Sequence, residues 1–358
     1  MTTHVALPRW MDLIAAALKP LPDEDALSGP WRRQGRAAVW YSRGAWVLAA
    51  VAEQIARANN GAPPHFWMPD YFCNQSTAAL RETNARLIFY PVDENLSPDW
   101  PRCDTMAEEI RSDVFLAVHF FGRPADMVRA RVFCDANDAL LFEDAAHVLR
   151  PLAGMATEAD ISLFCPHKSL PIPDGAVLIE RHVGTCPAPL GRAPGVGGWM
   201  AKRALQKLSP TGLLRSRNRR QAPPYAADPE FLPLPATPMM SAPAQRILMR
   251  AQPHLEQIDA ARRRHAGVLA EIINKMGLAL TPVFGTEGGG GFAPYRLVLK
   301  AQGTAAANDA YEALVEAGFP VNTWPDLPPE VTSNPAEHRW ALHFRQCLIF
   351  LPVFSDTI

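Results

Sequence analysis

Short apolar runs alternate with longer helix-like segments over the first half of the chain. Residues 45–56 are apolar on almost every side and repeat bulky side chains at helical spacing, so they predict a largely buried helix. Residues 73–83 predict a second helix. Apolar runs of strand length occur at residues 65–68, 85–90, 113–119, 131–134, 140–143 and 175–179. This alternation is typical of an α/β fold in which a mainly parallel sheet has helices on both faces.

The second half of the chain repeats the alternation on a smaller scale, after a stretch rich in prolines. The pattern predicts helices over residues 257–275 and 305–317 and strands over residues 293–299 and 346–351. Prolines favour extended connectors over helices. The chain is therefore expected to comprise an N-terminal arm (1–35) with a short helix from Trp10 to Leu18, a large domain (36–222), a proline-rich connector (223–245) and a small α/β C-terminal domain (246–358).

Composition and charge exclude several classes of function. With 358 residues and 48% hydrophobic content, the chain can bury a sizeable core, and its net charge of −1 gives no basic field for nucleic acid. No run approaches the roughly twenty uninterrupted apolar residues of a membrane span, and the amino terminus lacks the layout of a secretion signal. We therefore expect a cytoplasmic protein with no nucleic-acid or membrane partner. Basic runs at residues 215–220 and 262–264 are expected to be solvated helix faces, with a surface for an anionic ligand as the alternative.

Cysteine spacing bears on metals and disulfides. The six cysteines lie at positions 73, 103, 134, 165, 186 and 347, with no Cys-x-x-Cys pair among them. This scatter argues against both a zinc site and a disulfide framework. We expect free thiols, most of them buried, and no bound metal.

Lys168 and Asp144 are the strongest candidates for chemistry. Asp144 follows an apolar strand, and Lys168 lies beyond a second one, before an Asp-Gly pair and another strand. Pyridoxal phosphate chemistry requires an amine that can form an imine with the cofactor aldehyde and a carboxylate that keeps the pyridine nitrogen protonated. Taken singly, a loop lysine is usually a solvated charge and an aspartate after a strand is often a helix cap. The ordered pair favours the cofactor.

Three motifs resemble the DegT-type sugar aminotransferases, a branch of the aspartate-aminotransferase-like, fold type I enzymes. They are Val-His-Phe-Phe-Gly at 118–122, Phe-Glu-Asp-Ala-Ala-His at 142–147, and Phe-x-x-x-Lys at 164–168 followed by Asp-Gly at 174–175. Weaker similarity runs from about residue 36 to the end of the chain. The resemblance implies a homodimer that binds pyridoxal 5′-phosphate through Lys168 and moves an amino group, by resemblance from glutamate, to a keto group of a nucleotide-linked sugar.

The resemblance also implies roles for residues around this pair. Arg43 and Gly44 open the first long helix, where backbone N–H groups favour a phosphate, although the order of Arg and Gly is swapped relative to the family. His147 is expected near the ring oxygen of the cofactor. Tyr71 or Phe72 is expected to stack on the ring, because strict alignment places Cys73 at the aromatic position. Ordinary capping and core packing are the alternatives.

Other positions depart from the family pattern. Cys165 stands where relatives often have a phosphate-binding serine, and a thiol is the weaker donor, so Ser162 is a candidate substitute. The Asn that the partner subunit usually supplies is missing, and the nearby basic residue, Arg246, is displaced. Relatives also usually carry one further helix after the last strand. These departures keep two alternatives open, namely another pyridoxal phosphate reaction and a non-catalytic binding or regulatory protein.

Overall fold

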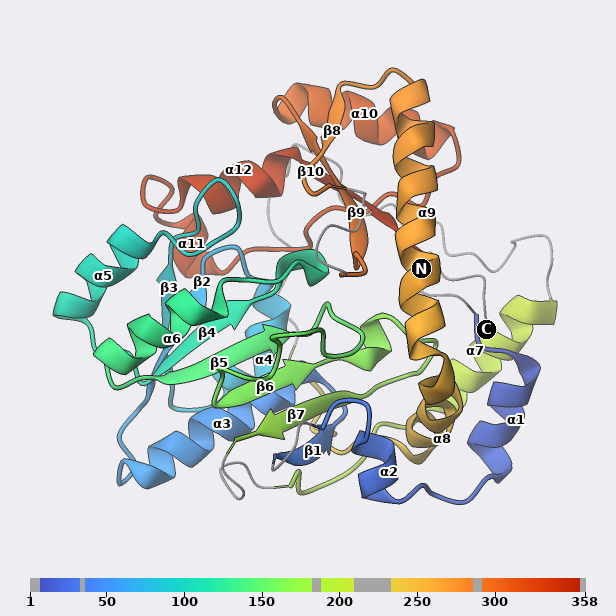
Figure 1. Cartoon of the computed structure of the whole chain (residues 1–358), viewed down its shortest axis with the longest axis horizontal. Coiled ribbons are helices and arrows are strands. Elements are labelled where there is room, and N and C mark those ends of the chain that lie inside the picture. Colours follow the sequence, from blue (N-terminus) through green and yellow to red (C-terminus); the bar gives the residue numbers. More distant parts are fainter. Residues whose placement is uncertain (1–6, 33–35, 182–187, 209–232, 286–291, 355–358) are drawn as a thin grey trace.

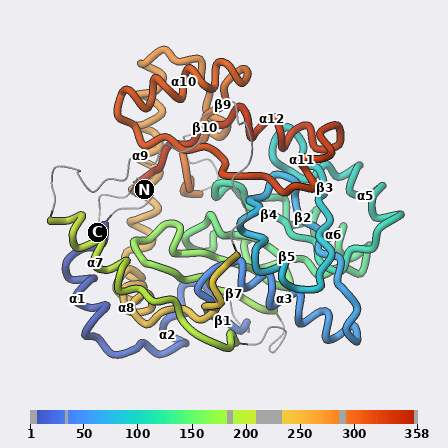
Figure 2. The backbone as a smooth tube through the Cα atoms, turned by 180° about the vertical axis from the view of Figure 1, so that it is seen from behind, coloured from blue at the N-terminus to red at the C-terminus, as the bar shows by residue number. Residues whose placement is uncertain are grey.

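The computed structural model describes residues 7–32, 36–181, 188–208, 233–285 and 292–354. Figure 1 shows a large body built around one twisted sheet, with a smaller lobe of later sequence above it. Figure 2 shows the same two parts from behind, with the last strand of the chain in the small lobe. In the described residues, no helix combines the length and apolar character that crossing a membrane requires.

The large sheet has seven strands in the order β1-β7-β6-β5-β4-β2-β3. Strands β6, β5, β4, β2 and β3 run parallel, whereas β7 is antiparallel to both of its neighbours. The strands are β1 (Ala37–Tyr41), β2 (His65–Pro69), β3 (Arg86–Tyr90), β4 (Val114–Val118), β5 (Leu140–Ala145), β6 (Ile161–Phe164) and β7 (Ala176–Glu180). The predicted α/β class and mainly parallel sheet are confirmed.

Helices cover both faces of this sheet, and alternate side chains of each strand reach opposite faces. Helix α3 (Gly44–Ala58) packs on the face that carries Phe142 and Leu163. Helices α5 (Trp100–Glu109) and α6 (Met127–Ala136) pack on the opposite face, which carries Leu141. Asp144 lies two positions after Phe142, and Cys165 lies two positions after Leu163. Both side chains are therefore expected on the α3 face of the sheet.

The prediction of a strand at residues 131–134 is wrong, because this segment lies inside α6. The Asp126 side chain accepts a hydrogen bond from the Arg129 N–H and so caps the helix. Its buried residues, Met127, Ala130, Phe133 and Cys134, recur at helical spacing. The helix predicted over 73–83 is divided into the 3₁₀ turn η1 (Asn74–Thr77) and α4 (Ala78–Arg81).

The small lobe has a three-stranded antiparallel sheet with the order β10-β9-β8. Its strands are β8 (Leu280–Pro282), β9 (Arg296–Ala301) and β10 (Leu348–Pro352). Helices α9 (Leu255–Lys275), α10 (Thr304–Glu316), α11 (Pro329–Thr332) and α12 (Arg339–Cys347) belong to the same part of the chain. Apolar residues of α9, α10, β9 and β10 form a separate core cluster. The elements predicted here are confirmed within a few residues.

The N-terminal helices lie against the large body. They are α1 (Trp10–Leu18) and α2 (Glu24–Ser28), and both contact α8 (Ala242–Ala251). Helix α7 (Gly197–Leu208) lies beside α1. Because α8 packs in the same apolar cluster as β1 and β7, it joins the large body even though it begins inside the predicted connector. The domain boundaries themselves remain predictions.

Two expectations about side chains have clear outcomes. The cysteines at 73, 103, 134, 165 and 347 are free thiols, and all but Cys73 are buried, while Cys186 lies outside the described residues. The basic run at 262–264 is not wholly solvated, because Arg262 is buried and donates a hydrogen bond to the Pro294 carbonyl. The run at 215–220 lies outside the described residues. Spacing alone could not show that α9 turns Arg262 toward the small-lobe sheet.

Candidate active site

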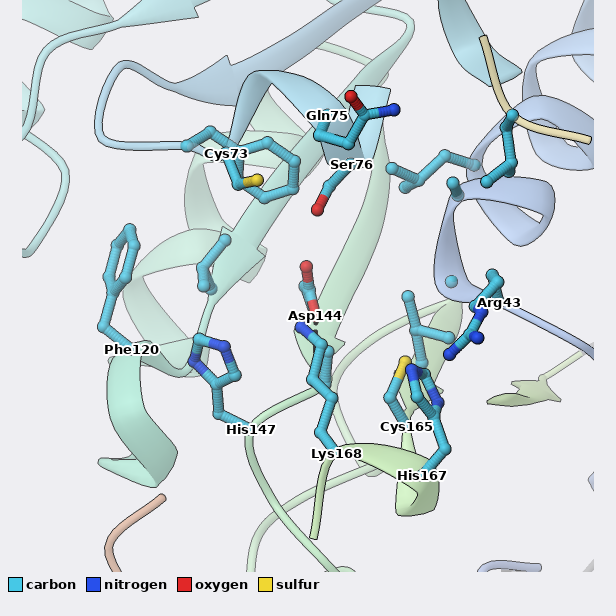
Figure 3. Close-up of a pocket in the computed structure, with 18 of the residues that line it drawn as sticks. Arg43, Cys73, Gln75, Ser76, Phe120, Asp144, His147, Cys165, His167 and Lys168 are labelled. Carbon is cyan, nitrogen blue, oxygen red and sulfur yellow. Dashed lines mark hydrogen bonds between the residues drawn. The ribbon is translucent and has the colours of Figure 1, made fainter. Parts of the chain in front are cut away.

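A cavity of about 250 Å³ lies where the carboxyl ends of β4, β5 and β6 meet the amino end of α3. Ligands favour this edge of a mainly parallel sheet. The predicted site residues that line it are Arg43, Gly44, Phe72, Asp144, His147, Cys165 and Lys168. Figure 3 shows the side chains of Asp144, His147 and Lys168 converging on one space. Tyr71, which was also predicted to contact the cofactor, is not among the lining residues.

Asp144 reaches the cavity because β5 turns it toward the α3 face. One carboxylate oxygen accepts a hydrogen bond from the Ala146 N–H at 2.8 Å, which fixes its rotamer. Burial raises the pKa of Asp144, while the nearby Lys168 ammonium and the Ala146 N–H act in the opposite direction. A cationic ring nitrogen placed against this carboxylate would offset the same desolvation.

Glu143 points to the opposite face of the sheet and forms a closed buried network. Its carboxylate is 2.8 Å from His119 Nε2 and accepts hydrogen bonds from the Ser162 hydroxyl at 2.6 Å and the Ala156 N–H at 2.9 Å. The expectation that Ser162 substitutes for Cys165 is therefore wrong. Strand alternation places its hydroxyl on the far side of β6 from the cavity.

Lys168 ends the 3₁₀ turn η3 (Pro166–Lys168), which leaves β6 at Cys165. Its backbone N–H donates to the Cys165 carbonyl at 2.9 Å, so the turn that carries the amine is itself hydrogen-bonded. Burial lowers the pKa of Lys168, but neighbouring groups, among them Asp144, outweigh it, and the net shift is upward. The site thus holds an amine and a carboxylate in one small space.

His147 is neutral in this site. Burial lowers its pKa well below the usual value, and the positive charges of Lys168, Arg296 and Arg262 lower it further. Its Nδ1 accepts a hydrogen bond from the Phe121 N–H at 3.2 Å. A neutral imidazole that accepts at Nδ1 carries its proton at Nε2, so His147 offers one N–H donor.

The amino end of α3 lies at one wall of the cavity. Arg43 is the N-cap residue and donates to the Pro173 carbonyl at 3.0 Å. A Cβ on Gly44 would lie 3.1 Å from both Cys165 Sγ and a Leu163 methyl, so a larger residue would crowd these two side chains. The Gly44 N–H bonds the Cys165 sulfur, and burial raises the pKa of that thiol to about 12. A neutral thiol therefore lies at the helix start.

Ser42, which precedes this helix start, serves the backbone and does not face the cavity. Its hydroxyl donates to the Thr237 carbonyl at 2.5 Å, and its N–H donates to the Pro238 carbonyl. The candidate groups for an anion at this wall are consequently the helix end, where anions bind in general, and the Arg43 guanidinium, whose pKa is lowered by burial.

Aromatic packing separates the two candidates for ring stacking. Tyr71 is fully buried, and its ring stacks on Trp324 with centroids 4.3 Å apart. Phe72 and Cys73 line the cavity, as does Trp324 from the small-lobe side. The placement thus favours Phe72 over Tyr71 as a residue able to touch a bound ring.

Other cavity residues were not singled out from the sequence. His167 lines the cavity beside Lys168, and its Nδ1 donates to the Gly175 carbonyl at 2.7 Å. Burial, with Arg43 and Lys168, lowers the pKa of His167 to about 3. Gln75 and Ser76 enter from η1 on the opposite wall, as Figure 3 shows. Adjacency to Lys168 was an available signal for His167, but nothing local marked the other two.

Arg246, the displaced basic residue, does not line the cavity. Its guanidinium donates to the Ala16 carbonyl at 2.8 Å and so ties α8 to α1. Within the described residues, no cluster of His, Cys, Asp and Glu has an arrangement that could hold a metal ion.

Comparison with solved structures gives similarity over almost the whole chain. No family model matches the sequence, and no curated protein matches it. Helicobacter pylori PseC, an aminotransferase involved in the biosynthesis of pseudoaminic acid, has a TM-score of 0.68 and 13% identity over 99% of this chain and 94% of its own. NtdA from Bacillus subtilis, solved with bound cofactor PMP, has a TM-score of 0.65 and 14% identity over 97% and 78%.

A DegT DnrJ EryC1 StrS aminotransferase from Brucella abortus is also similar, with a TM-score of 0.60 and 13% identity over 89% of this chain and 81% of its own. One of these structures thus bears the name of the family that the sequence motifs resemble. At such identities a structural likeness establishes architecture and leaves chemistry open. The chain has the aspartate-aminotransferase-like fold of these aminotransferases.

Proposed function

We propose that this protein is a pyridoxal 5′-phosphate-dependent aminotransferase that acts on a sugar. The observation that carries the proposal is the convergence of Lys168, Asp144 and His147 on one cavity in a fold shared with aminotransferases. When bound, the cofactor supplies an electron sink for the carbanion that forms at the α-carbon of an amino donor. The protein must supply an amine, a carboxylate and an anion site around it.

Lys168, Asp144 and His147 would each act on a different part of the cofactor. Lys168 would hold the cofactor through its amine and, once free, would carry a proton to or from the donor α-carbon. Asp144 keeps the ring nitrogen protonated, because a buried carboxylate is best stabilised by a cation in contact with it. His147 donates its Nε2–H to the ring oxygen. These tasks agree with the burial of Asp144 and the neutral state of His147.

The phosphate site is proposed at the start of α3, with Gly44 and Arg43 as the contacts. The helix end and the guanidinium both favour an anion. Cys165 can then offer only a weak S–H donor at this site, because burial keeps its thiol protonated and a thiol donates more weakly than a hydroxyl. We therefore expect weaker cofactor retention than a serine at position 165 would give.

The choice of donor and acceptor rests on the resemblance of the sequence motifs to the DegT-type family. Glutamate as donor, a nucleotide-linked keto sugar as acceptor, a homodimer and a cytoplasmic location are all proposed on this basis. The likeness to an aminotransferase involved in pseudoaminic acid biosynthesis supports this acceptor class in general terms. The charge of −1 agrees with small-molecule substrates in place of nucleic acid.

The test is an absorption spectrum of purified protein loaded with pyridoxal phosphate, taken before and after glutamate is added without an acceptor. A transaminase converts the visible band to the shorter-wavelength band of pyridoxamine phosphate and releases 2-oxoglutarate in equal amount. Loss of carbon dioxide or sulfide from suitable amino acids instead would indicate another pyridoxal reaction. A stable band that no amino acid changes would contradict catalysis and favour a binding protein.

A further inference from the structure

The His147 imidazole is held by a residue of the small lobe. Tyr295 lies directly before β9, and its ring stacks on the imidazole with centroids 4.4 Å apart and planes 7° apart. The backbone N–H of Tyr295 donates to the Phe121 carbonyl at 2.7 Å. Phe121 in turn donates its N–H to His147 Nδ1. Two contacts therefore join Tyr295 to the same histidine, one direct and one through the turn.

The turn at Phe120–Gly122, which lies between Tyr295 and His147, has a strained backbone. Phe121 has φ 57° and ψ 17°, the left-handed conformation that bulky residues rarely adopt. At Gly122, with φ +92°, a Cβ would lie 2.9 Å from the Ala293 carbonyl oxygen and 3.2 Å from that of His147. The small-lobe segment before β9 therefore packs directly against the turn. Such strain persists only where surrounding contacts hold it.

The side chain of Tyr295 is also contacted by Arg296. The Arg296 guanidinium lies over its ring, with Cζ 4.3 Å from the centroid, and donates to the phenolic oxygen at 3.1 Å. Arg296 is buried, and the buried Arg262 donates to the Pro294 carbonyl at 2.9 Å. A ring fixed by two backbone contacts and a guanidinium stack has little rotational freedom, so it can fix the imidazole that stacks on it.

We propose that Tyr295 is a positioning residue, which holds the His147 ring so that its Nε2–H is presented to the ring oxygen of the cofactor. The inference rests on the proposed function and adds the residue through which the small lobe acts on the cofactor. Tyr295 is not among the residues that line the cavity, and its ring contacts His147. Removing the phenol ring should therefore affect the cofactor in the same direction as removing the imidazole.

The test is a pH titration of the visible band of the loaded protein. A donor to the ring oxygen stabilises its negative charge, so loss of that donor makes the neighbouring imine nitrogen more basic and raises the pH of the titration. Loss of one hydrogen bond to a charged group corresponds to a rise of about one to two pH units. His147→Ala and Tyr295→Leu should both show it, whereas Tyr295→Phe, which keeps the ring, should titrate like the wild type.

The double variant separates positioning from a general loss of structure. If Tyr295 acts through His147, His147→Ala with Tyr295→Leu titrates at the same pH as His147→Ala alone. Full addition of the two shifts, or a wild-type titration in Tyr295→Leu, would overturn the proposal. Tyr295→Met, an unbranched filler of the same space, replaces the leucine variant if that one does not fold. A wild type without any visible band would refute the proposed function itself, whereas a normal band with unmoved Tyr295 variants refutes only the positioning role.

Discussion

Asp326 connects the small lobe to the cavity wall, and its removal should loosen that wall. The carboxylate is buried and accepts the N–H of Asn74 and the N–H of Gln75, each at 3.0 Å. These N–H groups belong to the first two residues of η1, the turn that carries Gln75 and Ser76 into the cavity. Asp326→Ala leaves both amides without this acceptor, so η1 should open more often.

The size of the effect follows from the two hydrogen bonds. A hydrogen bond to a charged group contributes about 1.5–3 kcal/mol, and each 1.4 kcal/mol is a factor of about ten in an equilibrium constant. The amides of Asn74 and Gln75 should then exchange with deuterium roughly 10–100-fold faster, as measured by mass spectrometry of a peptide that contains both. Asp326→Asn keeps one carbonyl oxygen, so one of the two amides should stay protected.

The matched control is Glu330→Gln, which removes a neighbouring small-lobe carboxylate. Glu330 pairs with Arg81 at 2.8 Å, but its side chain is 44% exposed. Exposed ion pairs contribute only about 0–1 kcal/mol, so this variant should leave the exchange of both amides nearly unchanged. Equal acceleration in the Asp326 and Glu330 variants, or none in either, would refute the reasoning from burial.

Two further predictions concern the turn and the buried network. Glu143 has a folded-state pKa below its ordinary value of 4.5, so its contribution to stability is present above that value and is lost as the pH falls through the folded-state pKa. In urea titrations at several pH values, Glu143→Gln should therefore reduce the loss of unfolding free energy as the pH falls. An unchanged dependence on pH would contradict the assignment. Gly122→Ala should lower the thermal midpoint much more than Gly154→Ala, because both have positive φ but only Gly122 meets a backbone oxygen, at 2.9 Å; equal losses would show that φ alone matters.

Local patterns were sufficient to predict most of the large domain. Strands β2 to β5 and the helix α3 follow from apolar runs and helical periodicity, since burial on both faces of a parallel sheet leaves few polar positions. The segment at 131–134 was misassigned because a short apolar run has no period of its own. Its capping residue, Asp126, was the missed signal.

The site was predictable where residues are close in sequence. Asp144, His147 and Lys168 come from two adjacent strand ends, so one motif region places all three at the cavity. Contacts that depend on the fold of distant segments were not predictable. Trp324 lines the cavity and Tyr295 stacks on His147, both from the small lobe. The rejection of Ser162 required knowing which face of β6 it occupies.

The central claim is that the Lys168 amine holds the cofactor. Borohydride reduction of the loaded protein, followed by digestion and mass spectrometry, locates the lysine that carries the reduced cofactor. We expect a single pyridoxyl phosphate group on the peptide that contains Lys168, and no labelling of that region in Lys168→Ala. A group attached to another lysine, or no attachment in the wild type, would contradict it.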